Sequence, residues 1–153
     1  MPRREKPPMN VWRCRVTGTA FAVRQRMAKV AVINSSEDTV EMLRTLLERE
    51  GWETVQGHVD DIKRGRMDFL QYLETHDPQV MIWDVSPPYD HNWAFLRLVR
   101  SSRAMQNRAV IVTTTNKPAL ERFVGPTDAV EIFIKPYDAE LLIDRITRTL
   151  KAA

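Results

Sequence analysis

The sequence predicts an α/β fold in which a parallel sheet of five strands is covered by helices on both faces. Five short apolar runs alternate with five stretches whose apolar residues recur at helical spacing. This alternation calls for parallel strands joined by right-handed crossovers. The third run, residues 80–84, is apolar until it ends in an aspartate, and Asp77-Pro78 and Pro87-Pro88 bound it. Such a run is typical of a strand buried on both faces.

The first strand and helix are expected between residues 30 and 51. Residues 30–33 are apolar, and leucines then recur at helical spacing until Gly51. Ser35 with Asp38 three residues later resembles a capping box, and Gly51 suits the position just after a helix. The pattern therefore predicts one strand, a polar loop and one helix.

The second strand is predicted at residues 52–56, which are less apolar and suit a sheet edge. Apolar residues between 62 and 73 mark one face of a single helix that ends before Asp77-Pro78. A third helix is expected around residues 93–99, where tryptophan, leucine and valine recur at helical spacing.

The last two strands are predicted at residues 109–113 and 130–134. Between them a short helix is expected over residues 118–124, with its proline in the first turn, where a missing N–H is harmless. Asp138 can cap the final helix. The apolar positions of that helix are Leu141, Leu142, Ile146 and Leu150.

Length and composition indicate one globular domain. The chain has 153 residues, of which 43% are hydrophobic, and no apolar stretch approaches the roughly 20 residues that cross a bilayer. Cys14 is the only cysteine, which fits a reducing compartment and excludes an internal disulfide or a cysteine metal cluster. We therefore expect a cytoplasmic protein that does not contact membranes. Nothing after Lys151 could form an output domain, so a stand-alone domain is expected.

The basic character of the chain is concentrated at its start. Residues 1–29 carry eight Lys or Arg and one acid, a balance of +7, so the remainder of the +3 chain carries −4. Residues 1–27 are expected to be a mostly disordered basic arm before a folded domain at 28–153. There are three alternatives for this arm. It could bind nucleic acid or acidic partners, it could be an organellar presequence, or translation could start at Met27.

Polar side chains follow the predicted strands at the edge where their carboxyl ends meet. They include Asn34 and Ser35 after the first strand, Asp84 after the third, residues 113–115 after the fourth and Lys135 after the fifth. Open α/β sheets bind ligands at this edge. A carboxylate, a hydroxyl and an ammonium together suit phosphoryl transfer through an acyl phosphate, because the cation and the hydroxyl can contact the phosphoryl oxygens.

From about residue 29 to residue 150, the chain resembles a receiver domain of two-component response regulators. The resemblance is carried by Asp84 with Pro88 four residues later, by a threonine that closes the fourth strand, and by Ile-Lys-Pro-Tyr at residues 134–137. It implies a flavodoxin-like sheet of order 2-1-3-4-5 and a phosphorelay role in signalling, without enzymatic activity.

The resemblance also implies roles for single residues. Asp84 would be the phosphoacceptor, and Lys135 would contact the phosphoryl group and precede a cis bond to Pro136. For the switch hydroxyl, counting from the start of the fourth strand favours Thr114, with Thr113 as the alternative.

Two departures from the family bear on the chemistry. The adjacent acids that hold Mg²⁺ in the family are replaced by Asn34 and Ser35. Since Mg²⁺ prefers anionic oxygens, its binding is expected to be weak. The remaining candidate metal ligands are Asp84, Ser86 and Glu37, with Asp38 as the alternative to Glu37. The family also has an aromatic residue three positions before the lysine, where this chain has Ile132 and places Phe133 on the opposite face.

These departures favour an atypical receiver that acts through protein–protein interaction, with weak or absent Mg²⁺-dependent phosphorylation at Asp84. The first alternative is an ordinary phosphoacceptor that a histidine kinase phosphorylates. The second is a flavodoxin-like carrier or enzyme using Ser35, Ser36 and Thr39, a loop without glycine and with acids that oppose a phosphate. The expected partners are a histidine kinase or another signalling protein, or a second copy of the chain.

Overall fold

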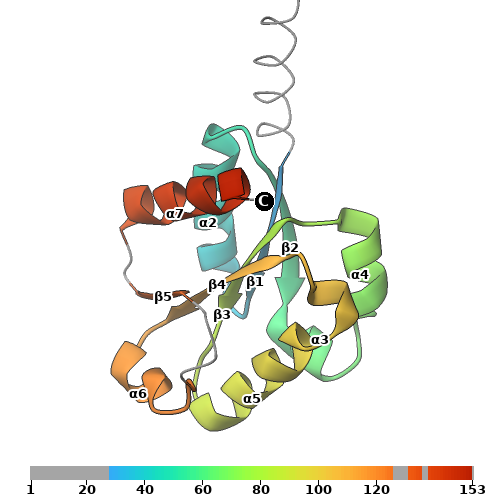
Figure 1. The fold of residues 1–153 in the computed structure, drawn as a ribbon, viewed down its shortest axis with the longest axis vertical. Helices are drawn as coiled ribbons and strands as arrows, with labels where there is room; N and C mark the ends of the chain where they lie inside the picture. The colour runs from blue at the N-terminus through green and yellow to red at the C-terminus, as the bar shows by residue number, and fades with distance from the viewer. Residues whose placement is uncertain (1–27, 126–130, 136–137, 153) are drawn as a thin grey trace, which may run out of the picture.

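The computed structural model describes residues 28–125, 131–135 and 138–152, so the predicted arm at 1–27 lies outside the described residues. The described chain builds one parallel sheet in the order β2-β1-β3-β4-β5 (Figure 1). The strands are β1 (Lys29–Asn34), β2 (Glu53–His58), β3 (Val80–Asp84), β4 (Ala109–Thr114) and β5 (Glu131–Ile134). The predicted flavodoxin-like α/β architecture and strand order are confirmed, with β2 at an edge as expected.

Helices cover both faces of the sheet (Figure 1). One face packs against α2 (Glu37–Arg49) and α7 (Ala139–Ala152). The other packs against α3 (Val59–Lys63), α4 (Phe69–His76), α5 (Tyr89–Arg100) and α6 (Lys117–Glu121), with a 3₁₀ turn at Arg103–Met105. Successive β1 residues alternate between these two cores, as a strand buried on both sides requires. Among the described residues, no helix combines the length and hydropathy that a membrane span needs.

Strand β3 is the centre of the core, and all five of its residues are buried. Trp83 is 1% exposed and packs edge-on against Phe69, with ring centroids 6.0 Å apart. The Phe95 ring of α5 contacts the Trp83 indole, with ring centroids 6.2 Å apart, so the indole links α4 and α5 to the sheet. Trp93 is also buried, so both tryptophans belong to the core.

The start of α2 differs from the predicted capping box. Ser36 is the residue that caps the helix, because its hydroxyl accepts a hydrogen bond from the Thr39 N–H. Ser35 is not the N-cap. The Asn34 side-chain oxygen accepts hydrogen bonds from the Ser35 and Ser36 N–H groups, which holds Ser35 in the loop before the helix. Gly51 follows the helix at φ 84°, as predicted for a C-terminal glycine.

The predicted single helix over residues 62–73 is wrong. Two helices, α3 and α4, are separated at Gly65, whose φ of 70° is not helical. Asp68 then starts α4 by accepting a hydrogen bond from the Gln71 N–H at 3.1 Å. The break leaves α3 as a separate short helix directly after β2, beside the first turn of α5.

The last third of the chain follows the prediction in most respects. Pro118 lies in the first turn of α6, and Asp138 caps α7 by accepting from the Glu140 and Leu141 N–H groups. Leu142 and Ile146 are fully buried, whereas Leu141 is 51% exposed and does not belong to the predicted apolar face. Helix α6 ends earlier than predicted, at Glu121.

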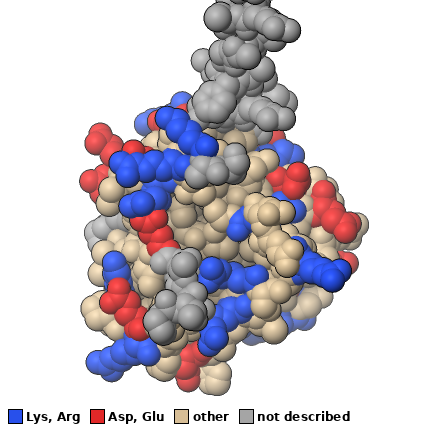
Figure 2. Space-filling view, in the orientation of Figure 1, with Lys and Arg blue, Asp and Glu red and all other residues tan. Residues whose placement is uncertain are grey.

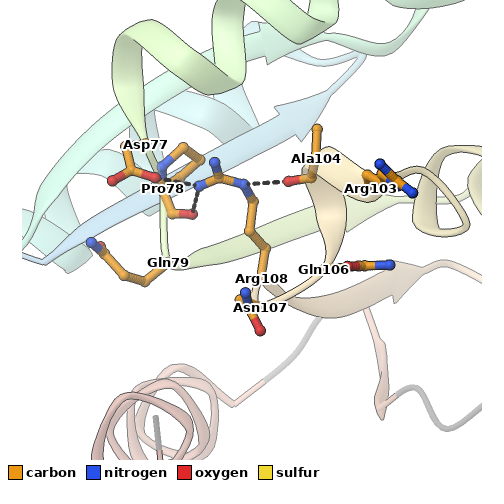
Figure 3. A pocket seen from close by; sticks show the side chains of 8 residues that line it. All are labelled: Asp77, Pro78, Gln79, Arg103, Ala104, Gln106, Asn107 and Arg108. Atoms are coloured by element: carbon orange, nitrogen blue, oxygen red, sulfur yellow. Dashed lines mark hydrogen bonds and ion pairs between the residues drawn. The ribbon is translucent and has the colours of Figure 1, made fainter.

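At the amino edge of the sheet, Arg108 joins the turn between α4 and β3 to the 3₁₀ turn (Figure 3). Its guanidinium donates to the Asp77 carboxylate at 2.8 Å and to the Pro78 carbonyl at 2.7 Å. Its Nε donates to the Ala104 carbonyl at 2.9 Å. These bonds hold the end of α4, the start of β3 and the 3₁₀ turn together, just before β4 begins.

We predict that Arg108→Met lowers the free energy of unfolding by about 2 kcal/mol, because two part-buried carbonyl groups lose a charged donor. Urea denaturation followed by tryptophan emission measures the change. Arg103 is an exposed arginine that lines a hollow together with Arg108, and it provides the matched control. Arg103→Met is expected to stay within about 0.5 kcal/mol of the parent. Equal effects of the two substitutions would contradict the joining role of Arg108.

Candidate functional site

Asp84 ends the buried strand β3 and is 8% exposed. In the sheet register it lies beside Thr113 of β4. On the other side, Ile33 pairs with Trp83, so Asn34 is the β1 residue nearest to Asp84 along the sheet. A carboxylate with so little contact with water needs partners from the protein.

The main partner of Asp84 is Lys135, which follows β5. The ammonium nitrogen of Lys135 lies 2.6 Å from Oδ1 of Asp84, and only 21% of the lysine side chain is exposed. The backbone N–H of Lys135 donates to the Thr114 carbonyl at 2.8 Å, which continues the β4–β5 ladder and fixes the start of the side chain. The structure thus brings together the aspartate and the lysine that the sequence placed in one pocket.

The second partner is a threonine hydroxyl. Thr113 donates from Oγ1 to Oδ1 of Asp84 at 3.2 Å. Neighbouring strand residues face opposite sides, and the Thr114 hydroxyl instead accepts the Asn116 N–H at 3.5 Å. The structure therefore brings Thr113, the alternative, to Asp84, and does not bring the favoured Thr114 there. Counting residues from the predicted start of β4 could not decide between Thr113 and Thr114, because the two are adjacent.

Asn34 and Ser35, at the end of β1, do not supply anionic oxygens. Asn34 is 2% exposed, and its side-chain carbonyl oxygen accepts the Ser35 and Ser36 N–H groups at 2.7 and 2.9 Å. Glu37 lines a hollow beside β2, together with Asn34, His58 and Asp61. The described part of the chain contains no group of three or more His, Cys, Asp or Glu side chains arranged to hold a metal ion.

The loop after Asp84 is held by hydrogen bonds. The Val85 N–H donates to the Thr113 carbonyl at 2.9 Å, and the Ser86 carbonyl accepts from the Asn92 side-chain amide at 2.6 Å. Asn92 in turn accepts a hydrogen bond from the ammonium of Lys63. No sequence pattern singles out Asn92 or Lys63, because their contact depends on the position of α3.

This donor set does not fit Mg²⁺. The ion prefers hard anionic oxygens in near-octahedral geometry and keeps several waters. Here the carboxylate of Asp84 is already paired with an ammonium, the Asn34 oxygen is engaged by backbone N–H groups, and the Ser86 carbonyl is hydrogen-bonded.

Near the pocket, β5 presents its aromatic residue to the far side of the sheet. Phe133 is 6% exposed and belongs to the core beneath α2 and α7. Ile132 packs on the opposite face, the one that contains Trp83. Pro136 and Tyr137, including the predicted cis bond, lie outside the described residues, and the described cis peptide bond joins Pro87 to Pro88.

No protein-family model matches the sequence, and no curated protein matches it. Solved structures do match the fold. A sensor protein from Polaromonas sp. JS666 has a TM-score of 0.66 at 20% identity, over 82% of this chain and 97% of that one. Chemotaxis protein CheY4 of Vibrio cholerae has a TM-score of 0.61 at 22% identity, over 80% and 98%. The signal receiver domain of a histidine kinase from Syntrophus aciditrophicus has a TM-score of 0.64 at 20% identity, over 82% and 92%.

The chain has the flavodoxin-like fold of receiver domains. At these identities the likeness concerns the fold, and the chemistry of the pocket has to be argued from the side chains of this chain.

We predict that Lys135→Met lowers the free energy of unfolding by about 2 kcal/mol, because it leaves the Asp84 carboxylate buried with one hydroxyl partner. Asp84→Asn should cost less, about 1 kcal/mol, since the partly exposed lysine can turn to water. The double variant should be more stable than Lys135→Met alone. Urea denaturation of the three variants measures this cycle, and additive effects would mean that the pair contributes nothing.

Proposed function

We propose that the protein is a receiver-like signalling protein that acts through protein–protein interaction, with weak or absent Mg²⁺-dependent phosphorylation at Asp84. The observation that carries this proposal is the ion pair between Asp84 and Lys135 in a pocket whose β1 residue is an amide. The receiver-domain fold of the chain supports the signalling class. Binding, rather than enzymatic turnover, is the activity that we assign to it.

Charge balance is the physical reason for weak phosphorylation. Transfer of a phosphoryl group to a carboxylate brings further negative charge to a buried site, and a bound metal ion would normally neutralise it. In this pocket Lys135 is the cation that the structure places on Asp84. Lys135 and Thr113 both contact Oδ1 of Asp84, so the same lysine would have to meet the charge of the incoming phosphoryl oxygens, without a second acid to anchor a metal.

A surface for partners is present beside the pocket. Ile134 is 47% exposed and Leu141 is 51% exposed, and both line a hollow with Lys117 and Asp138. Exposed apolar side chains next to charged ones suit a protein interface with a polar rim. We propose a histidine kinase, another signalling protein or a second copy of this chain as the partner.

The charge distribution supports a protein partner. On the face shown in Figure 2, Lys and Arg side chains lie among Asp and Glu side chains instead of gathering into one basic area. Nucleic-acid binding by a folded domain favours a clustered basic surface. We therefore assign no nucleic-acid contact to this face.

The second candidate is an ordinary phosphoacceptor, favoured by the meeting of Asp84, Thr113 and Lys135 in one pocket. The flavodoxin-like carrier or enzyme has less support. Its hydroxyl loop is engaged in capping α2, because the Ser36 hydroxyl accepts from both the N–H and the hydroxyl of Thr39.

Acetyl phosphate separates the two candidates. We expect little labelling of the full chain at Asp84 by intact mass, and little change between samples with and without Mg²⁺. A beryllofluoride mimic followed by tryptophan emission is the parallel measurement, since Trp83 precedes the acid. Strong Mg²⁺-dependent labelling that Asp84→Asn abolishes would restore the ordinary phosphoacceptor.

Restoring the acids tests the same explanation in the opposite direction. Asn34→Asp with Ser35→Asp should raise Mg²⁺ affinity at least about tenfold, because two anionic oxygens are added beside Asp84. An aspartate at position 34 can still accept the two backbone N–H groups that Asn34 accepts, so the loop should fold as before. Calorimetric titration with Mg²⁺ measures the gain.

A further inference from the structure

The hollow around Arg108 at the amino edge of the sheet has no part in the proposed function. It measures about 390 Å³ and is lined by residues 77–79, before β3, and by Arg103, Ala104 and residues 106–108, before β4. We call it the amino-edge hollow. Because Asp84 and Lys135 lie at the carboxyl ends of their strands, this hollow is at the opposite edge of the sheet.

Hydrogen bonds hold the two sides of the amino-edge hollow together. The Ala109 N–H donates to the Gln79 carbonyl at 3.0 Å, so the segments before β3 and β4 already run side by side. The Arg108 N–H donates to the Met105 carbonyl at 3.2 Å, and Met105 is 4% exposed, which fixes the loop between the 3₁₀ turn and β4. A ligand that binds there does not have to order a loose loop first.

The charges that line the amino-edge hollow favour an anion. Arg103 is exposed, and within the described part of the chain no hydrogen bond or ion pair engages its guanidinium. Asp77 is the acid of the lining, and the Arg108 guanidinium neutralises it at 2.8 Å. Two arginines against one aspartate leave a positive charge, and Arg103 carries it.

Amide side chains add hydrogen-bond donors to the lining, and they belong to Gln79, Gln106 and Asn107. The Gln79 side-chain oxygen accepts the Lys29 N–H at 2.7 Å, so the amide N–H groups of Gln79 are left as donors. In Figure 3 the Arg108 side chain crosses the hollow, with Gln79 on one side and Gln106 and Arg103 on the other. Donors are therefore present on both sides.

The end of a helix opposes an anion at this place. Helix α4 ends beside the hollow, and the carboxyl end of a helix carries partial negative charge. The Arg108 guanidinium offsets it, because it donates to the Leu73 carbonyl of the last turn at 3.5 Å and to the Pro78 carbonyl at 2.7 Å. The charge of Arg103 therefore remains available to a ligand.

We propose that the amino-edge hollow binds a phosphate group, with the Arg103 guanidinium as its cation and the neighbouring amides as further donors. A phosphate has oxygens in several directions, which suits donors on two sides, whereas a carboxylate presents its two oxygens in one plane. The phosphate is supplied either as the free ion or as a monoester of a small molecule. At about 390 Å³, the hollow leaves room for an organic part beside the phosphate.

A phosphate in this hollow would join the segments before β3 and β4 from outside. It would add to the contacts that Arg108 makes between the same segments. Since a ligand that binds only the folded chain stabilises it, phosphate should raise the melting temperature. The site is independent of phosphorylation at Asp84, because the two places lie at opposite edges of the sheet.

Calorimetric titration of the full chain with inorganic phosphate, without Mg²⁺ and with NaCl at matched ionic strength as the blank, tests the proposal. We expect binding by the parent and at least about tenfold weaker binding by Arg103→Met, because a charge-assisted hydrogen bond is lost. Gln79→Glu should also weaken binding. It adds a negative charge to the lining, while its carboxylate can still accept the Lys29 N–H.

Arg64→Met is the matched control, because it removes an exposed arginine at the end of α3, which follows the carboxyl end of β2. It should bind phosphate as the parent does. Without phosphate, Arg103→Met should melt at the temperature of the parent, and it should lack the increase that phosphate gives the parent. No detectable binding by the parent, or equal affinities in Arg103→Met and Arg64→Met, would overturn the proposal.

Two further titrations of the parent chain define the ligand. Acetate should bind more weakly than phosphate, and an equal affinity for acetate would contradict the choice of phosphate. Glycerol phosphate distinguishes the two sources of the phosphate group. Binding tighter than that of inorganic phosphate assigns a monoester, and binding no tighter assigns the free ion.

Discussion

A carboxylate that ends a fully buried strand constrains the rest of this structure. Asp84 is 8% exposed, so its charge has to be met by groups that the protein supplies. Lys135 and Thr113 do so from β5 and β4, which requires both strands to keep one register relative to β3. The pairing of three strands and the charge balance of the pocket therefore depend on the same set of contacts.

The strand order and the layers could be predicted because they follow from patterns that span many residues. The apolar run before Asp84, the alternation of strand and helix, and the position of Lys135 each restrict the topology independently. The break at Gly65 escaped prediction because the apolar residues on both sides of it have helical spacing. Local backbone conformation at one glycine decided between one helix and two.

The candidate site was predictable in its charged members and less so in its neutral ones. Asp84 and Lys135 lie at the carboxyl ends of strands. An error of one residue in the predicted strand boundary would still place both at the same edge of the sheet. Thr113 and Thr114 are adjacent and chemically identical, so only the observed register separates them. Asn92 depends on a contact between α3 and α5, two helices whose relative placement no periodicity encodes.

Strands β3 and β4 are fastened at both ends. Arg108 joins the segments that precede them at the amino edge, and the Asp84 hydrogen bond with Thr113 joins them at the carboxyl edge. Sliding or fraying of one strand against the other would break contacts at two distant points at once. The pair should consequently open only with the whole molecule, which makes its amide protons the slowest to exchange with solvent deuterium.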